Sequence, residues 1–336
     1  CYALPTVGTD FPVPCYQTYD YSDHRHPGTD ARAPHLGLYA QEEQTWRDFV
    51  FRVGGRVNHI RHDIDLLQGA RPGDDQASWN KALFSAGVRF NQSRDLAVYA
   101  NAGTSFKAPS LKSVGGTIPL SDKGREGVTG QLPNPDLEPE SGLSLDVGAD
   151  YRAMPSVSFG TRAFLIEIAD QISTTVVTAT GSQSQDINSG KTRTAGLELE
   201  VRQAVTDLGE WYGNYTLTHA EVVDSPEADR DGAALSFVPR HTGNLGGHLS
   251  LPGDARLVGN LQAVSGIRQN VSQSGPGKLD GYYLLTARLE KRFGGADGRE
   301  VRVYLEPYNL TDQQFEMPWG FQDPGFSTAG GVIVAF

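Results

Sequence analysis

The segment Tyr99–Tyr151 reads YANAGTSFKAPSLKSVGGTIPLSDKGREGVTGQLPNPDLEPESGLSLDVGADY, and the interpretation of the whole chain starts from it. Residues 96–104 have the character of a β-strand, and strict apolar–polar alternation from Leu143 to Tyr151 predicts a second, half-buried strand. About 30 mostly polar, glycine-rich residues separate these strands, and a connection of that length usually marks a functional loop. We therefore expect residues 105–139 to form a long functional loop without regular structure.

The composition excludes transmembrane helices but allows a membrane protein built from strands. The chain has 336 residues, 38% of them apolar, and lacks the run of about 18 apolar residues that a transmembrane helix requires. A barrel strand needs only about 10 residues of alternating character, so its hydropathy signal is weak. The net charge of −11, without a basic stripe, argues against nucleic acid as a partner.

The order of turns and loops predicts the architecture. Alternation predicts about 13 strands between residue 35 and the C-terminus. Short turns lie near residues 46, 93, 155, 207, 253 and 296, and longer polar stretches, such as 61–78, lie between them. Short connections on one side and long ones on the other are typical of outer-membrane barrels. A β-bulge is compatible with residues 157–168, where the phase of the alternation is unclear.

The alternation also predicts two chemically different faces. One face carries the aliphatic residues Leu197, Leu199, Val201, Leu285, Ala287, Leu289, Val301, Val303 and Leu305. The other carries the charged residues Glu198, Glu200, Arg202, Arg288, Glu290, Arg302 and Glu306. A soluble sandwich and a wide barrel both fit this pattern, since the polar face can meet solvent or a lumen. Predicted strands of about 12 residues favour the barrel, because typical soluble strands have about 5–6.

Six motifs carry a family resemblance. They are GLYAQEE (37–43), FKAPS (106–110), NPDLEPE (134–140), GKTRTAGLELE (190–200), VPRHT (238–242) and YNLTD (308–312). In this order and spacing they resemble the C-terminal part of the β-barrel of TonB-dependent outer-membrane receptors. The pair FKAPS and NPDLEPE is similar to the late-barrel signature of that family.

The resemblance implies a fold and a location. It implies an all-β, transmembrane antiparallel barrel in the bacterial outer membrane, in which residues 1–336 supply about the last 13 of roughly 22 strands. The plug domain is expected outside this sequence, in a longer protein or with another polypeptide completing the wall. Residues 1–35 and 105–139 are then extracellular loops. The implied partners are the lipid bilayer, a TonB-type energy-transducing protein that acts through the plug, and the barrel assembly machinery, which recognises Phe336.

The residues that could carry chemistry do not suggest an enzyme, a cofactor or a resident metal. His24 and His26 fit a solvated loop better than a metal site. Asp224, Asp229 and Asp231 lack the spacing of a calcium loop and read as acidic solubilisation. Cys1 and Cys15 favour a disulfide in an exposed loop, with a free pair as the alternative. Cys1 as a lipid-modified residue is the less favoured interpretation.

The expected ligand is a small iron chelate. Phe106 with the cations Lys107, Lys112, Lys123 and Arg125 suits an anionic, partly apolar ferric siderophore. Equally, these cations could simply solvate the loop. Further aromatic contacts are predicted at Tyr16, Tyr19, Trp319 and Phe321. Haem is disfavoured, since residues 110–133 contain no histidine where haem receptors of the family are expected to have one. The alternatives are a receptor-like barrel with a structural or surface-interaction role but no active transport, and a soluble all-β carbohydrate-binding module.

Overall fold

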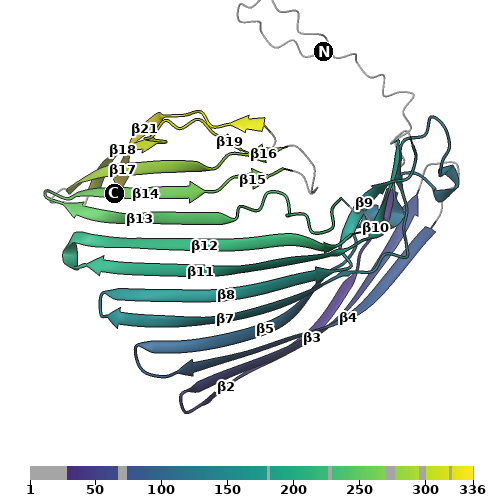
Figure 1. Ribbon diagram of the computed structural model, residues 1–336, viewed down its shortest axis with the longest axis horizontal. Helices are drawn as coiled ribbons and strands as arrows, with labels where there is room; N and C mark the ends of the chain where they lie inside the picture. The colour runs from purple at the N-terminus through teal and green to yellow at the C-terminus, as the bar shows by residue number, and fades with distance from the viewer. Residues whose placement is uncertain are drawn as a thin grey trace, which may run out of the picture.

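The computed structural model describes residues 29–66, 74–179, 182–225, 229–269, 277–294, 300–317 and 320–335. Within these ranges most residues belong to one antiparallel sheet that forms a curved wall (Figure 1). This confirms the predicted all-β, mostly antiparallel fold. Among the described helices, none is long and apolar enough to cross a membrane.

The wall is a 14-stranded sheet whose strands pair largely in chain order. Its strands are β1 (Thr29–Arg32), β2 (His35–Trp46), β3 (Phe49–Leu66), β4 (Asp74–Asn91), β5 (Leu96–Lys107), β7 (Glu140–Met154), β8 (Val157–Ala169), β11 (Lys191–Val205), β12 (Gly209–Asp224), β13 (His241–Leu251), β14 (Ala255–Val264), β17 (Tyr282–Gly294), β18 (Glu300–Tyr308) and β21 (Ser327–Ala335). The described strands form an open sheet, with β1 and β2 at one edge and β21 at the other.

The first edge is one strand interrupted at Pro34. β1 and β2 pair with β3 in a single continuous register. Pro34 has no N–H to donate to the ladder, but its carbonyl accepts a hydrogen bond from the Arg61 N–H at 3.1 Å. The expected loop 1–35 is therefore wrong at its C-terminal end, because residues 29–32 and the start of β2 are already part of the sheet. Residues 1–28 lie outside the described residues.

Connections of two lengths leave the wall at opposite ends, as predicted. Short connections follow β2, β4, β7, β11, β13 and β17, and we call their end of the wall the turn end. The longer connections follow β5, β8, β12, β14 and β18 at the opposite end, the loop end. The β3–β4 connection also lies there but is shorter than predicted, because both strands extend into residues 61–78.

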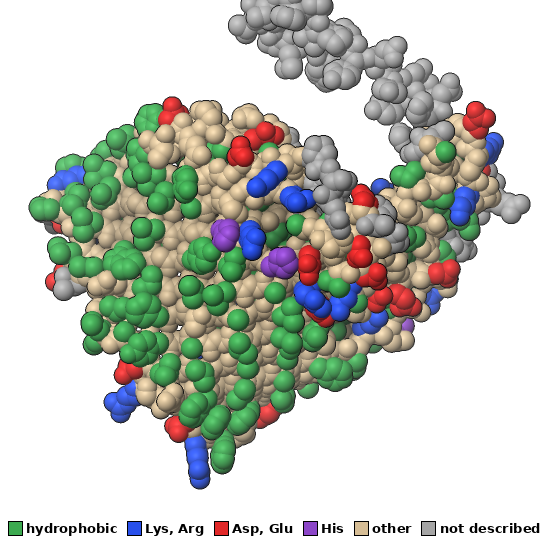
Figure 2. All heavy atoms as spheres, in the orientation of Figure 1, with side chains coloured by type: hydrophobic (Ala, Val, Ile, Leu, Met, Phe, Trp, Pro, Cys, Tyr) green, Lys and Arg blue, Asp and Glu red, His purple; other side chains and the backbone are tan. Residues whose placement is uncertain are grey.

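The two predicted faces are confirmed by the strand register. Leu197 on β11 lies opposite Leu217, whereas Glu198 lies opposite Thr216 on the other face. We call the aliphatic side the outer face and the charged side the inner face. Outer-face residues such as Val147 and Leu305 are more than half exposed, at 55% and 52%. Figure 2 shows many such apolar side chains spread over the wall, with charged ones gathered toward the end near β9 and β10. Exposed apolar side chains spread over one face in this way mark a surface that contacts a membrane or another protein.

Along the β3–β4 hairpin, the apolar side chains switch from the outer face to the inner face near the loop end. Closer to the turn end, apolar residues such as Val53 and Phe84 point outward and are 56% and 66% exposed. Beyond Asn58, apolar residues occupy the inner face instead, where Ile60 and Trp79 are 6% and 7% exposed. Something must therefore cover the inner face at this height.

The cover is a folded unit made from two long connections. Residues 108–139 contain α1 (Leu111–Gly115), η1 (Leu120–Asp122) and β6 (Gly130–Leu132), and residues 170–190 contain β9 (Ile172–Val176) and β10 (Gln183–Asn188). We call the described residues of these two segments the loop unit. Its strands form the sheet β6-β10-β9, with β6 parallel to β10. The expectation of an irregular loop over 105–139 is therefore wrong.

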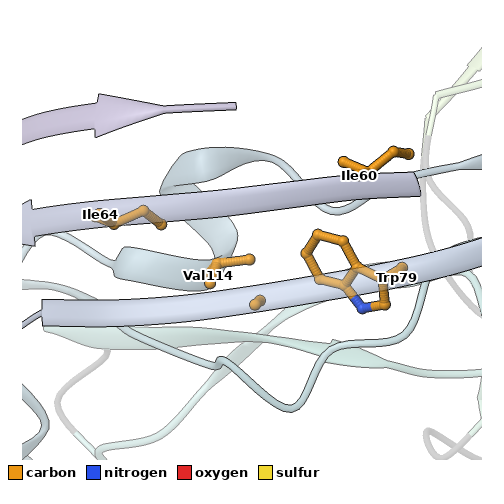
Figure 3. Packing of buried hydrophobic residues seen from close by; sticks show 5 residues of the cluster. Ile60, Ile64, Trp79 and Val114 are labelled. Carbon is orange, nitrogen blue, oxygen red and sulfur yellow. The ribbon is translucent and has the colours of Figure 1, made fainter. Parts of the chain in front are cut away.

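Helix α1 packs the loop unit onto the wall. Val114 is fully buried against Ile60, Ile64, Ala77 and Trp79 of β3 and β4 (Figure 3). Burying an aliphatic side chain of this size contributes about 1.5–3 kcal/mol. The cluster fixes the unit against the inner face.

The remaining short elements lie at the ends of the wall. They are η2 (Thr206–Leu208), the pair β15 (Ile267–Arg268) and β16 (Lys278–Leu279), and the pair β19 (Glu316–Met317) and β20 (Phe321–Gln322). β8 pairs with β11 without a register shift, so the bulge considered for residues 157–168 is wrong. Irregular pairings lie instead on β7 between Arg152 and Met154, beside the turn, and on β11 between Lys191 and Thr192.

Aromatic rings on the inner face lie over glycines of the next strand. A Cβ added at Gly148 would lie 2.4 Å from the ring of Tyr99, its cross-strand neighbour. Three further cross-strand pairs share this arrangement: Phe164 with Gly196, Tyr212 with Gly246, and Tyr304 with Gly331. The missing side chain leaves a gap that the ring fills, which stabilises the register.

Candidate ligand-binding surface

The two motifs that flank the long connection have structural roles. In FKAPS, Ser110 begins α1, and its Oγ accepts a hydrogen bond from the Ser113 N–H at 3.0 Å. In NPDLEPE, the carbonyl of Leu137 accepts a hydrogen bond from the Trp79 Nε1–H at 2.9 Å. Leu137 is only 1% exposed. The motifs thus hold each end of the connection against β3 and β4.

The two long connections are joined by amide side chains from β10. Gln183 is fully buried, donates to the Asp122 carbonyl at 2.8 Å and accepts from the Gly124 N–H at 2.7 Å. Asn188 accepts from the Glu138 N–H at 2.8 Å and donates to the Glu138 carbonyl at 2.7 Å. Main-chain groups of the first connection are thereby paired with side chains of the second. The loop unit behaves as one packed body.

Asp186 is a buried carboxylate within this body. Its Oδ1 accepts a hydrogen bond from Thr174 Oγ1 at 2.7 Å, and its main-chain carbonyl accepts one from Asn134 Nδ2 at 2.8 Å. Burial alone would raise the pKa of Asp186. Hydrogen bonds from neighbouring side chains and the charge of Lys112 outweigh burial, so the pKa lies below the usual carboxyl value.

The predicted cations lie in or beside the loop unit, but two of them are ion-paired. Lys107 Nζ lies 3.3 Å from Glu140 Oε1, and Arg125 Nη1 lies 3.1 Å from a carboxylate oxygen three residues earlier. The side chains of Lys112 and Lys123 are exposed on the surface of the unit. These two lysines remain the stronger candidates for an anionic ligand.

The predicted aromatic contacts divide into three groups. Phe106 packs against the cluster around Val114, which gives it a structural contact. Phe321 is 66% exposed on β20, where it remains a candidate for ligand stacking. The remaining predicted aromatic contacts, Tyr16, Tyr19 and Trp319, lie outside the described part of the chain, as do Cys1, Cys15 and Phe336.

The inner face of β2 and β3 carries a polar group that the sequence analysis missed. Asn58 is 4% exposed, and its Oδ1 lies 2.7 Å from Arg56 Nε and 3.0 Å from His35 Nε2, which both donate to it. Tyr39 lies opposite Arg56 and is 79% exposed. A Cβ at Gly37 would lie 2.8 Å from Arg56 Nη2, so the guanidinium lies against β2.

Arg56 differs from most inner-face arginines in its charge environment. Within the described ranges it has no carboxylate partner at ion-pair distance, although it is exposed. Other inner-face guanidinium groups are ion-paired, as in Arg52 with Glu43, Arg89 with Asp150, Arg162 with Asp146, Arg288 with Glu290, and Arg302 with Glu300. The sequence signal that could have found this group is the alternation of β3: if it is continued past Val57, Arg56 and Asn58 fall together on the inner face.

Toward the turn end the inner face is hollowed but charge-neutralised. Two adjoining cavities of about 320 and 340 Å³ share Arg89 and Asp150 in their linings. Arg89 Nη1 lies 2.7 Å from Asp150 Oδ2, so neither charge is left uncompensated. Among the described residues, no group of three or more His, Cys, Asp or Glu side chains is placed to hold a metal ion.

A curved antiparallel wall with an apolar outer face, a charged inner face and folded loops at one end is typical of large transmembrane β-barrels. The family description "TonB dependent receptor-like, beta-barrel" matches residues 4–310. The chain therefore belongs to the TonB-dependent receptor β-barrel family, as its motifs indicated. Proteins of this family are outer-membrane β-barrels that act as receptors and transporters.

Several characterised proteins resemble the chain over part of their length. The ferric-pyoverdine receptor PbuA of Pseudomonas sp. strain M114 is 41% identical over 138 residues, which is 39% of this chain and 16% of PbuA. The ferrioxamine B receptor of Salmonella typhimurium strain SL1344 is 23% identical over 323 residues, which is 93% of this chain and 41% of that receptor.

A solved structure, the siderophore receptor PiuA from Acinetobacter baumannii, matches with a TM-score of 0.71 at 15% identity. The match covers 91% of this chain and 43% of PiuA. At that identity the likeness shows the fold alone. The chain spans less than half the length of all three proteins.

Proposed function

We propose that the chain is the C-terminal part of the barrel wall of an outer-membrane receptor that takes up a ferric siderophore by TonB-dependent transport. The observation that carries the proposal is the packed loop unit at one end of a charged inner face. A preformed, partly cationic surface at the mouth of a lumen suits capture of a small anionic chelate. Family membership and the siderophore-receptor relatives support the same assignment.

The proposal fixes an orientation and a set of partners. The described strands supply about the last 13 of roughly 22, and the outer face meets the lipid bilayer. The loop end faces the outside, so residues 105–139 and the segment 1–28 are extracellular. A plug outside this sequence contacts the TonB-type protein, and the assembly machinery recognises Phe336.

Ligand capture requires no covalent chemistry. Lys112 and Lys123 form no ion pair within 4.0 Å among the described residues, Phe321 offers a stacking surface, and the ion-paired Lys107 and Arg125 add weaker attraction. Binding and gated release into the lumen complete the receptor's part. This is transport and not catalysis.

An uptake assay tests the assignment. Iron-starved cells with and without the gene are given radioactive iron as ferric pyoverdine, ferrioxamine B, ferric citrate or a ferric tris-catecholate. We expect deletion to abolish uptake of at least one chelate, and a protonophore to abolish it in the wild type. If deletion leaves uptake of all four unchanged, the siderophore assignment is wrong.

A second candidate is a receptor-like barrel with a structural or surface-interaction role and no active transport. The ion pairs of Lys107 and Arg125 favour it, since charges already neutralised by the protein are less available to a ligand. Cells that bind a chelate at the surface without importing it would support this candidate.

A further inference from the structure

We infer that docking of the loop unit on the wall is sensitive to acid and that His62 of β3 is the residue that titrates. The loop unit stays docked while the imidazole ring of His62 is neutral, and it opens when the ring takes up a proton. Opening of this kind is a property of the loop unit itself and is independent of which ligand the protein carries.

His62 lies inside the contact between the wall and the loop unit. It is 5% exposed, and its ring meets that of Trp79 edge to face, with 5.0 Å between the ring centroids. Ile60 and Ile64, two residues away on either side, belong to the cluster that packs against Val114 of α1 (Figure 3). Because these side chains enclose the ring, it meets water freely only when the loop unit moves off the wall.

The hydrogen bonding of His62 opposes a second proton on the ring. Its Nδ1 is buried and has no hydrogen-bond partner in the described part of the chain. A neutral imidazole carries one N–H, whereas the protonated ring carries one on each nitrogen. Protonation therefore places an N–H on Nδ1 without an acceptor and brings a positive charge into an apolar cluster. A buried charge without a partner is strongly disfavoured, and opening relieves it by returning the ring to water.

The charged side chains described around His62 do not offset this cost. Lys112 of α1 is exposed, and Lys81 of β4 lies 4.0 Å from a carboxylate oxygen of Glu138, whose side chain is mostly exposed. β1 contributes the apolar Ala31 to the cluster. The cations among these groups would repel a protonated ring and not stabilise it.

The direction of the pH effect follows from burial. On the outer face of the same stretch of β3, Arg61 and Asp63 form an ion pair, so His62 lies beyond the apolar band of the wall. Burial lowers the pKa of His62 below its usual value of 6.5. Docking is therefore strongest above about pH 6.5 and weakens as the pH falls from there toward the lowered pKa. If the docked ring stays neutral throughout, the open population rises about 30-fold between about pH 7.5 and 5, which is the upper limit.

Hydrogen exchange of the full receptor in detergent measures this opening, with the rates at each pH divided by the intrinsic rates of unfolded peptide. We expect opening of the wild type, followed in residues 111–115 and 134–140, to increase several-fold between about pH 7.5 and 5, within the limit of about 30-fold. His62→Phe keeps a ring beside Trp79 but cannot take up a proton, so the increase should disappear.

His59→Gln is the matched control, because His59 lies on the same strand but is exposed, with Nδ1 2.9 Å from Asn80 Oδ1. This variant should keep the pH dependence of the wild type. Folding of each variant is checked by its heat-modifiable mobility on a gel, and His62→Gln carries the test if His62→Phe does not fold. Equal opening of the wild type at both pH values would overturn the inference. An unchanged acid response in a folded His62 variant, or its loss in His59→Gln, would overturn it as well.

Discussion

The contact between Trp79 and Leu137 makes a specific prediction about the loop unit. Trp79→Phe removes the Nε1–H that donates to the Leu137 carbonyl at 2.9 Å, while a ring remains in the cluster with Val114. The Leu137 carbonyl then stays buried without its partner, because the residue is only 1% exposed. We expect the loop unit to open from the wall more often, with the strands themselves unchanged.

The magnitude follows from the cost of the orphaned carbonyl. Leaving a buried acceptor unsatisfied costs about 1–3 kcal/mol, which corresponds to roughly a 5- to 150-fold larger population of the open form. Because slow amide exchange reports such local opening, exchange in residues 111–115 and 134–140 should accelerate by about the same factor. The lost indole volume adds to this effect.

Hydrogen exchange followed by mass spectrometry on the full receptor measures the change. Trp46→Phe is the matched control, since Trp46 is 57% exposed at the turn end and should leave exchange in the loop unit unaffected. Equal exchange rates in Trp79→Phe and wild type would refute the role assigned to this hydrogen bond.

Three further predictions concern the wall and the loop unit. Gly148→Ala should destabilise the wall by about 1–3 kcal/mol, because its Cβ would overlap the Tyr99 ring; an unchanged urea midpoint would contradict this. Gln183→Leu removes the side-chain hydrogen bonds to the carbonyls of Asp122 and Val128 and to the N–H of Gly124. The segment should open more often as a result, so trypsin should cleave after Lys123 faster than in the wild type. The pKa of Asp186 is lowered in the folded state, so its stabilising effect is present above about pH 3.8 and is lost as the pH falls through the folded pKa. Hydrogen exchange of the amides of residues 172–176, measured over a series of acid pH values, should show this loss. Asp186→Asn should abolish this pH dependence of the exchange.

Most of the wall could be predicted because its two faces impose opposite demands on alternate residues, apolar on the outer face and charged on the inner face. Leu197 and Glu198 lie on opposite faces in the sequence pattern and in the structure. The prediction failed where the surroundings of the inner face change. On β3, Val57 points outward while Ile60 points inward, because the loop unit replaces the lumen beyond Asn58. In the sequence, this switch of the apolar residues from one face to the other resembles the end of a strand. The extension of β3 and β4 into residues 61–78 was therefore not predicted.

The candidate site was harder to predict because its contacts join distant segments. Gln183 contacts a carbonyl 61 residues away, and Trp79 contacts one 58 residues away. Nothing local distinguishes these side chains from ordinary polar or aromatic residues. The motifs around residues 106–110 and 134–140 identified the family correctly, yet their structural roles depend on partners in β3, β4 and β10. Arg56 follows the same strand alternation as other inner-face arginines, and its surroundings depend on neighbours in β2 and β4.

The parallel pairing of β6 with β10 has a consequence for how such receptors diversify. A change of length in residues 108–139 alone would shift β6 against the ladder that residues 183–185 hold in place. A change of length in one segment is therefore expected to require a matching change in the other. Chimeras that exchange both segments between receptors should assemble, whereas exchange of one segment should leave its neighbour without a docking surface.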